Sequence, residues 1–216
     1  AVETCAPRNK RSVSYSRAPG VVQSPTMSNP GRKAEIRKKA AQVFAEKGFD
    51  RASIRDVAKA AEMSLAGLYY YYRGKEEILF DIEHTAFSTL LEGHSENLAG
   101  VSDPIEKLDK IIDAHISFFI QNISEMKVMV HETNQLSGQY LEEAAELRRR
   151  YVRLVRGILE EVKAKQKTRD ISTGTASFLL FGMMNWLYTW YSPDHDADPK
   201  VVSAAVREIF LNGYLK

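Results

Sequence analysis

The stretch from Ser53 to Leu79, "SIRDVAKAAEMSLAGLYYYYRGKEEIL", decides the fold of this chain. Ser53 is a favourable helix N-cap, and Asp56 follows three residues later in a variant of the capping-box pattern. Ser64 is a second N-cap candidate, after which apolar residues resume. The stretch therefore predicts two short helices, one beginning after each serine, joined by a tight turn.

A longer helical pattern precedes these two helices. Apolar residues recur at helical spacing from Arg32 until Gly48, which closes the segment as a C-cap would: Ile36, Ala40, Val43 and Phe44. One long helix followed by two short ones, at Ser53–Ala61 and Ser64–Tyr71, makes a helix-turn-helix, whose last helix normally enters the major groove of DNA.

From about Lys33 to Phe80 the sequence resembles the DNA-binding segment of the tetracycline-repressor (TetR) family of bacterial regulators. The Leu-Tyr pair at 68–69 and "KEEIL" at 75–79 match the family pattern. The resemblance implies an all-α fold, in which an N-terminal three-helix helix-turn-helix DNA-binding domain (31–76) is followed by a larger helical ligand-binding and dimerisation domain (77–216). Residues 1–30 mix Pro, Ser, Gly and basic residues without a sustained period, so we expect a flexible tail there.

Two residues depart from the family pattern. Glu62 stands where the family usually has a turn glycine, and it predicts either a left-handed backbone conformation, at a cost of about 1 kcal/mol, or a slightly different turn. Gly74 replaces the usual Ser or Asn before the fourth helix.

Four consecutive tyrosines, at 69–72, cannot all point to one side of a helix. Leu68 and Tyr72 are i, i+4 neighbours, so we expect them to pack against Phe44 and Val57. Tyr69 and Tyr70 should then face the duplex, where phenolic hydroxyls bond phosphate oxygens. Tyr71 is expected to be split between the two environments. The alternative is that all four tyrosines are core or half-buried surface.

The spacing and the resemblance together predict a set of DNA contacts. Lys75 resembles the family's phosphate-binding lysine, and the helix N-terminus beside it supplies backbone donors. Arg55 can make bidentate contacts to guanine. The alternative is that Arg55 is only a solvated charge on the surface of its helix. The predicted DNA-binding residues are Ser53, Arg55, Ser64, Leu65, Ala66, Gly67, Tyr69, Tyr70 and Lys75.

The first part of the chain is basic and the second part is acidic. This distribution of charge suggests a DNA-binding module followed by a different kind of domain. Residues 31–80 carry eleven Lys/Arg against seven Asp/Glu, whereas residues 81–216 carry fifteen against twenty. The sole cysteine, Cys5, excludes an internal disulfide framework and favours a cytoplasmic setting. The apolar run 176–191 is shorter than the roughly 20 residues of a membrane span, so no membrane partner is expected.

Helical patterns also fill the second half of the chain. Apolar residues from Ile105 to Phe119 follow helical spacing, and further helices are predicted at 123–132, 138–165, 171–191 and 199–214, with "SPDHDADP" as a loop before the last. The last two helices carry more apolar residues than are required to pack one helix face against the core. In the resembling family these two helices pair with their symmetry mates, which implies a homodimer that reads a roughly palindromic operator on double-stranded DNA.

Aromatic and methionine side chains in this half suggest a pocket for an apolar small-molecule effector, although a packed core is the plain alternative. The segment "MMNWLYTWYSPDHDADP" resembles the acyl-CoA-responsive TetR repressors of fatty-acid and steroid degradation, and implies an acyl-CoA effector. Arginines in "LRRRYVRLVR" would bind its phosphates, unless they form a solvated helix face or pair with Glu142, Glu143 and Glu146. The predicted ligand contacts are Phe118, Phe119, Met126, Met129, Tyr140, Arg149, Arg153, Met183, Trp186 and Trp190.

Three other functions compete with that of an acyl-CoA-responsive repressor. An enzyme is disfavoured because the sequence lacks a GxSxG elbow, a phosphate-binding GxxxxGK[ST] loop, an HExxH motif and a Gly-rich dinucleotide fingerprint. No cofactor or metal is expected. A TetR-type regulator of efflux would bind an aromatic or cationic compound instead, and a helical protein-interaction module would lack operator binding.

Overall fold

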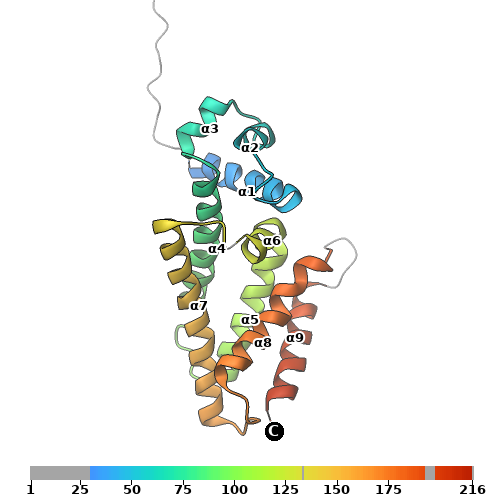
Figure 1. Cartoon of the computed structure of the whole chain (residues 1–216). Helices are drawn as coiled ribbons and strands as arrows, with labels where there is room; N and C mark the ends of the chain where they lie inside the picture. Colours follow the sequence, from blue (N-terminus) through green and yellow to red (C-terminus); the bar gives the residue numbers. More distant parts are fainter. Residues whose placement is uncertain (1–29, 133, 193–197, 216) are drawn as a thin grey trace, which may run out of the picture.

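The computed structural model describes residues 30–132, 134–192 and 198–215, and within them the chain is all-α, as predicted (Figure 1). Residues 1–29 of the predicted tail and 193–197 of the predicted loop lie outside the described residues. None of the described helices is long and apolar enough to cross a membrane. The elements are α1 (Pro30–Lys47), α2 (Ile54–Ala60), α3 (Leu65–Tyr71), α4 (Lys75–Asn97), α5 (Pro104–Gln121), α6 (Ile123–His131), α7 (Gly138–Lys165), α8 (Thr173–Asn185), the 3-10 helix η1 (Trp186–Thr189) and α9 (Pro199–Tyr214).

Side-chain caps fix the starts of the two short helices. Ser53 Oγ accepts the backbone N–H of Asp56 at 3.2 Å, and Asp56 Oδ2 accepts the backbone N–H of Ser53 at 2.8 Å, which completes a capping box. Ser64 Oγ accepts the backbone N–H of Gly67 at 3.0 Å. Each cap satisfies a backbone donor that the first helical turn leaves free, and both predicted caps are confirmed.

The turn between α2 and α3 is a Schellman motif with a glutamate in the glycine position. Glu62 has a φ of +51°, the left-handed conformation that the sequence offered as one of two outcomes. Its N–H donates to the carbonyl oxygen of Lys59, and the N–H of Met63 donates to that of Ala58, at 3.1 and 3.0 Å. The helix end is therefore closed by backbone hydrogen bonds despite the missing glycine.

The helix ends in the second half follow the predictions closely, with one difference. The helices α7 and α9 have the predicted bounds, whereas the predicted helix 171–191 is α8 followed by the 3-10 turn η1. The change from α to 3-10 geometry begins at Trp186 and alters which side chains face inward after it.

Two apolar cores share helix α4. The first core joins α1, α2, α3 and the start of α4 around Phe44, Leu68 and Tyr72, and it also takes Val128 from α6 and Ala144 from α7. It therefore extends past residue 76, where the sequence places a domain boundary. The second and larger core is formed by α4, α5, α7, α8 and α9. Figure 1 shows α4 running from the α1–α3 end of the molecule along α7, so one rigid helix connects both cores.

Candidate functional site

The outward face of α3 carries the tyrosines that the core does not use. Leu68 and Tyr72 are 0% and 1% exposed in the core with Phe44, while Tyr69 and Tyr70 are 50% and 54% exposed. Tyr71 is half-buried and meets Tyr70 edge to face at 5.2 Å between ring centroids. The predicted division of the four tyrosines between core and surface is confirmed, and the alternative that all four are core or half-buried is wrong; the contact of Tyr69 and Tyr70 with DNA stays a prediction.

The other predicted DNA-binding residues lie on the same end of the molecule. Ser53, Arg55, Ser64 and Ala66 are exposed, and Leu65 and Gly67 are half-buried. A Cβ at Gly67 would lie 3.2 Å from Ser64 Oγ, so this glycine lets the N-cap serine close over the first turn of α3. The Ser64 hydroxyl accepts through its oxygen and donates its hydrogen to none of the described residues, whereas the Ser53 hydroxyl donates to Asp56 Oδ2 at 2.6 Å.

The side chain of Lys75 binds backbone carbonyl groups of the protein itself. Its ammonium group lies within hydrogen-bonding distance of the carbonyl oxygens of Phe49, Asp50 and Ala52, at 2.9, 3.2 and 3.4 Å. It also lies 4.4 Å from the centroid of the Phe49 ring. An ammonium group has three donors, so these carbonyls occupy all of them. A phosphate contact by the Lys75 side chain stays a prediction, and the structure adds that Lys75 fastens the start of α4 to the loop after α1.

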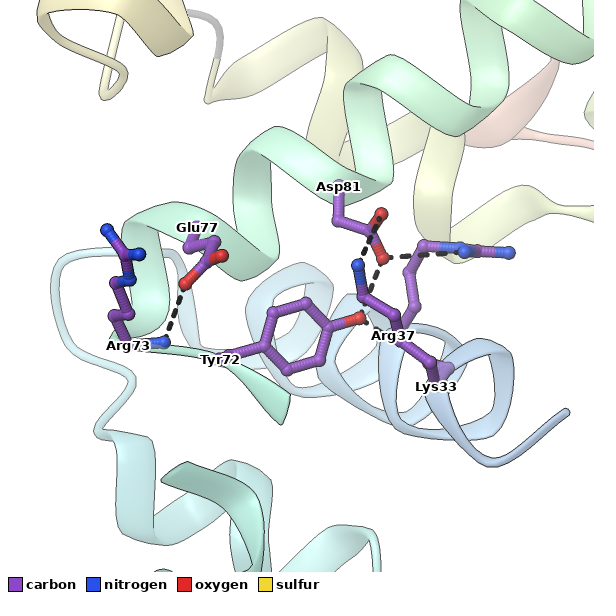
Figure 2. A network of polar contacts seen from close by, with 6 residues as sticks. All are labelled: Lys33, Arg37, Tyr72, Arg73, Glu77 and Asp81. Carbon is purple, nitrogen blue, oxygen red and sulfur yellow. Dashed lines mark hydrogen bonds and ion pairs between the residues drawn. The ribbon is translucent and has the colours of Figure 1, made fainter. Parts of the chain in front are cut away.

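Asp81 on α4 holds the C-terminal end of α3 (Figure 2). Its Oδ2 accepts the hydroxyl of Tyr72, the C-cap residue of α3, at 2.7 Å. The same carboxylate pairs with Arg37 and Lys33 of α1 at 3.4 and 3.5 Å. Burial and the neighbouring carboxylate raise the pKa of Tyr72 above its usual value, so its hydroxyl stays a donor. Residues of α4 thus hold the C-terminal end of α3, through Tyr72, and the loop between α1 and α2, through Lys75.

A cavity of about 270 Å³ lies between α4, α5, α6, α7 and α8. Three of the ten predicted ligand residues line it: Phe119, Met126 and Met129. Arg148, one of the arginines predicted to bind phosphates, also lines it. The remaining lining residues were not predicted as ligand contacts, and most are apolar: Phe87, Leu90, His115, Val130, Tyr151, Val152, Phe178, Phe181 and Asn185.

The other seven predicted ligand residues do not line this cavity. Trp186 and Trp190 are 61% and 52% exposed, because the 3-10 turn carries both rings outward. Tyr140 stacks on Phe80 at 4.7 Å, and Phe118 and Met183 pack against the second core. Arg149 and Arg153 pair with Glu146 at 3.0 and 2.6 Å, which is the ion-pair alternative that the sequence left open. The prediction that all ten residues share one pocket is therefore corrected.

Arg148 is the arginine that reaches the cavity. It pairs at 3.1 Å with Glu83, which is 0% exposed and belongs to α4. Burial raises the pKa of Glu83 to about 7, although the charge and the hydrogen bond of Arg148 oppose that shift. Glu83 Oε1 and Arg148 Nε have no partner within the described residues, so this buried pair is incompletely satisfied. The Arg148–Glu83 pair connects the cavity wall to α4, the helix that also contacts the C-terminal end of α3.

A chain of buried polar groups forms another part of the wall. Tyr151 Oη lies 2.8 Å from His115 Nδ1 and 3.3 Å from His94 Nε2, and His115 Nε2 lies 3.1 Å from Asn185 Oδ1. Burial lowers the pKa of His94 to about 4 and that of His115 to about 3, so both rings are neutral at pH 7. Sequence reasoning missed this chain, although His115 stands out as a polar residue on the apolar side of its helix.

Comparison with known proteins agrees with both parts of the molecule. Residues 36–82 match the family of bacterial regulatory proteins described as the tetR family, and residues 101–214 match the tetracyclin repressor-like C-terminal domain. The chain belongs to the TetR family. TetR proteins are transcriptional regulators rather than enzymes, and the described residues contain no group of three His, Cys, Asp or Glu side chains that could hold a metal ion.

Individual TetR proteins resemble the chain over most of its length. The fatty acid metabolism regulator protein of Bacillus subtilis is 24% identical over 176 residues, which is 81% of this chain and 91% of the relative. The regulator PfmR of Thermus thermophilus is 30% identical, with a TM-score of 0.74 over 82% of this chain and 97% of that one. AibR, solved with isovaleryl coenzyme A and operator DNA, is 22% identical, with a TM-score of 0.73 and the same coverage.

Proposed function

We propose that this TetR protein is a ligand-responsive repressor that binds a palindromic operator as a homodimer, with a fatty acyl-CoA or a similar apolar compound as its effector. The observation that carries the proposal is the connection through α4. This helix holds the C-terminal end of α3 through Asp81 and the loop between α1 and α2 through Lys75, and its Glu83 pairs with Arg148 of the cavity wall. A ligand that alters the cavity wall would therefore act on the helix that positions the DNA-binding face.

The exposed residues of α3 support DNA binding. Tyr69, Tyr70 and Ala66 present hydroxyls, rings and a methyl group at the end of the molecule, with Arg55 exposed on the neighbouring α2. The N-terminus of α4 has no side-chain cap at Gly74, so its first backbone N–H groups are suited to a phosphate oxygen. We propose that the Lys75 contact to DNA is made through this backbone.

An exposed apolar surface on the last elements supports the dimer. Large apolar side chains of α8, η1 and α9 lie more than half exposed: Phe178, Leu179, Trp186, Trp190, Val201 and Ile209. Such a set on neighbouring helices is typical of a subunit interface. Two protomers joined there would present two α3 helices to successive major grooves.

The cavity supports an effector with an apolar part. Its volume of about 270 Å³ is slightly below the roughly 300–1,000 Å³ of typical ligand pockets, so it suits an acyl group rather than a complete coenzyme A molecule. Val130 is an exposed member of the lining outside the proposed subunit interface and marks its opening. The described lining contains no carboxylate that would pair with a cationic effector, which argues against an effector of that class. The fatty acid regulator of B. subtilis and the isovaleryl-CoA complex of AibR point to the same class.

The test uses the full chain and acyl-CoAs of increasing chain length, with free coenzyme A, free fatty acids and unrelated drugs as controls. A ligand at about 100 times its Kd adds about 2.7 kcal/mol to the free energy of unfolding, which a thermal shift detects. A stabilising acyl-CoA should also weaken binding to DNA selected from a random pool by this protein. Stabilisation by a drug and by none of the thioesters would reject the acyl-CoA proposal, and unchanged DNA affinity at saturating ligand would reject its regulatory role.

A further inference from the structure

The polar chain at the cavity wall has a definite hydrogen-bond direction. Asn185 Oδ1 can only accept, so His115 Nε2 carries the hydrogen of that contact. Because the ring is neutral, His115 Nδ1 must then accept the hydroxyl hydrogen of Tyr151. The hydroxyl has no second hydrogen, so His94 Nε2 donates to its oxygen.

The unpaired atom at the far end of the chain agrees with this direction. His94 Nδ1 is buried without a partner in the described structure, and in the direction derived above it is a bare acceptor. The opposite direction would place an N–H group at this atom and leave a buried donor unpaired instead. The tautomers of both rings thus follow from the Asn185 amide, whose oxygen faces His115.

The amide nitrogen of Asn185 is the free end of the chain. Asn185 lines the cavity, and its Nδ2 makes no hydrogen bond to any residue that the structure describes. Apolar side chains such as Phe119, Met126 and Phe181 form much of the wall around it. The cavity thus offers a neutral, oriented hydrogen-bond donor in apolar surroundings.

We propose that Asn185 Nδ2 donates a hydrogen bond to the carbonyl oxygen of a neutral acyl group, with Tyr151, His115 and His94 as positioning residues. A thioester or ester carbonyl needs one donor and no counter-ion. A carboxylate would lose its hydration without gaining a free cation, because Arg148 is already paired with Glu83. The inference rests on the proposed function. It narrows the class of effector from a fatty acyl-CoA or a similar apolar compound to a neutral acyl ester or thioester.

A pair of ligands that differ in one oxygen atom tests the proposal. Octanoyl-CoA has the thioester carbonyl, and S-octyl-CoA replaces it with a methylene group. Calorimetric titration of the full chain should show about tenfold tighter binding of octanoyl-CoA, which is the effect of one well-placed hydrogen bond. Asn185→Leu should remove the preference by weakening thioester binding alone, and Tyr151→Phe should reduce it. Asn97→Leu, at the exposed end of α4, should leave it unchanged.

The outcomes separate this inference from the proposed function. Equal binding of both ligands to the wild-type protein, or an undiminished preference in Asn185→Leu, would overturn the role of Asn185 and leave an acyl-CoA effector intact. Tighter binding of free octanoate than of octanoyl-CoA would overturn the neutral acyl class. Failure of either CoA compound to bind would overturn the acyl-CoA proposal itself. Should Asn185→Leu fail to fold, the preference measured in Tyr151→Phe decides.

Discussion

Tyr72 Oη donates to Asp81 Oδ2 over 2.7 Å, and this bond joins the C-terminal end of α3 to α4 (Figure 2). The same aspartate pairs with α1 through Arg37 and Lys33, so three elements of the DNA-binding end meet at one carboxylate. Because α4 continues to Glu83 and the cavity wall, the position of α3 is coupled to the ligand region by a short path of direct contacts.

Removal of the Tyr72 hydroxyl should weaken this junction. We expect Tyr72→Phe to lower the free energy of unfolding by about 1.5–3 kcal/mol, the usual effect of a hydrogen bond to a charged group. The ring stays in the core, so the change reports the bond rather than packing. Urea denaturation measures it, and Tyr71→Phe, on the half-buried neighbour, is the matched control. Equal stability of the Tyr72→Phe and wild-type proteins would contradict a role for this bond.

Lys75 should matter for stability as well as for DNA. Lys75→Met keeps the aliphatic stem but removes the donors to three carbonyl oxygens and the contact over Phe49. We expect a loss of about 1–3 kcal/mol in the free energy of unfolding. The slope of log DNA affinity against log salt should stay unchanged if the phosphate contact is made by backbone N–H groups. A slope reduced by about 0.9 would instead show that the ammonium group neutralises a phosphate.

The exposed tyrosines should affect DNA binding without affecting folding. Tyr70 is 54% exposed and its ring meets only the edge of the half-buried Tyr71, so Tyr70→Phe should leave the melting temperature unchanged. Loss of its phosphate hydrogen bond should weaken operator binding about three- to tenfold, as measured by fluorescence anisotropy. Glu92→Gln, exposed on α4 away from α3, provides the control. An unchanged affinity would remove Tyr70 from the DNA interface.

Local signals account for what could be predicted from the sequence. Ser53 and Ser64 cap helices through atoms three residues away, and the bounds of α7 and α9 follow from periodicity within each helix. The cavity depends on long-range packing instead. Tyr151 meets residues 57 and 36 positions earlier in the chain, and no pattern within one helix reveals such a meeting. Likewise, the 3-10 turn at Trp186 turned two predicted pocket residues outward.

The apolar surface of α8 and α9 should hold the dimer together. Ile209 is 65% exposed on α9, and a lysine there would place a charge in the proposed interface. We expect Ile209→Lys to convert the dimer to monomers in light-scattering chromatography and to weaken operator binding in parallel. Glu208→Lys would test whether any new charge on this helix has the same effect. A dimer that persists in Ile209→Lys would place the interface elsewhere.

Glu83 should give the protein a characteristic pH dependence. Its pKa is raised from 4.5 to about 7 by burial, so between these values the native state binds more protons than the unfolded state. The contribution of this group to stability is therefore complete below about pH 4.5 and is lost as the pH rises through about 7. Glu83→Gln lacks this titration and should gain stability relative to the wild-type protein over the same range, by a few kcal/mol at most. Chemical denaturation of both proteins from pH 4.5 to 8 measures the difference. A difference that does not vary with pH would show that the Glu83 carboxyl is ionised throughout and that Arg148 fully compensates its burial.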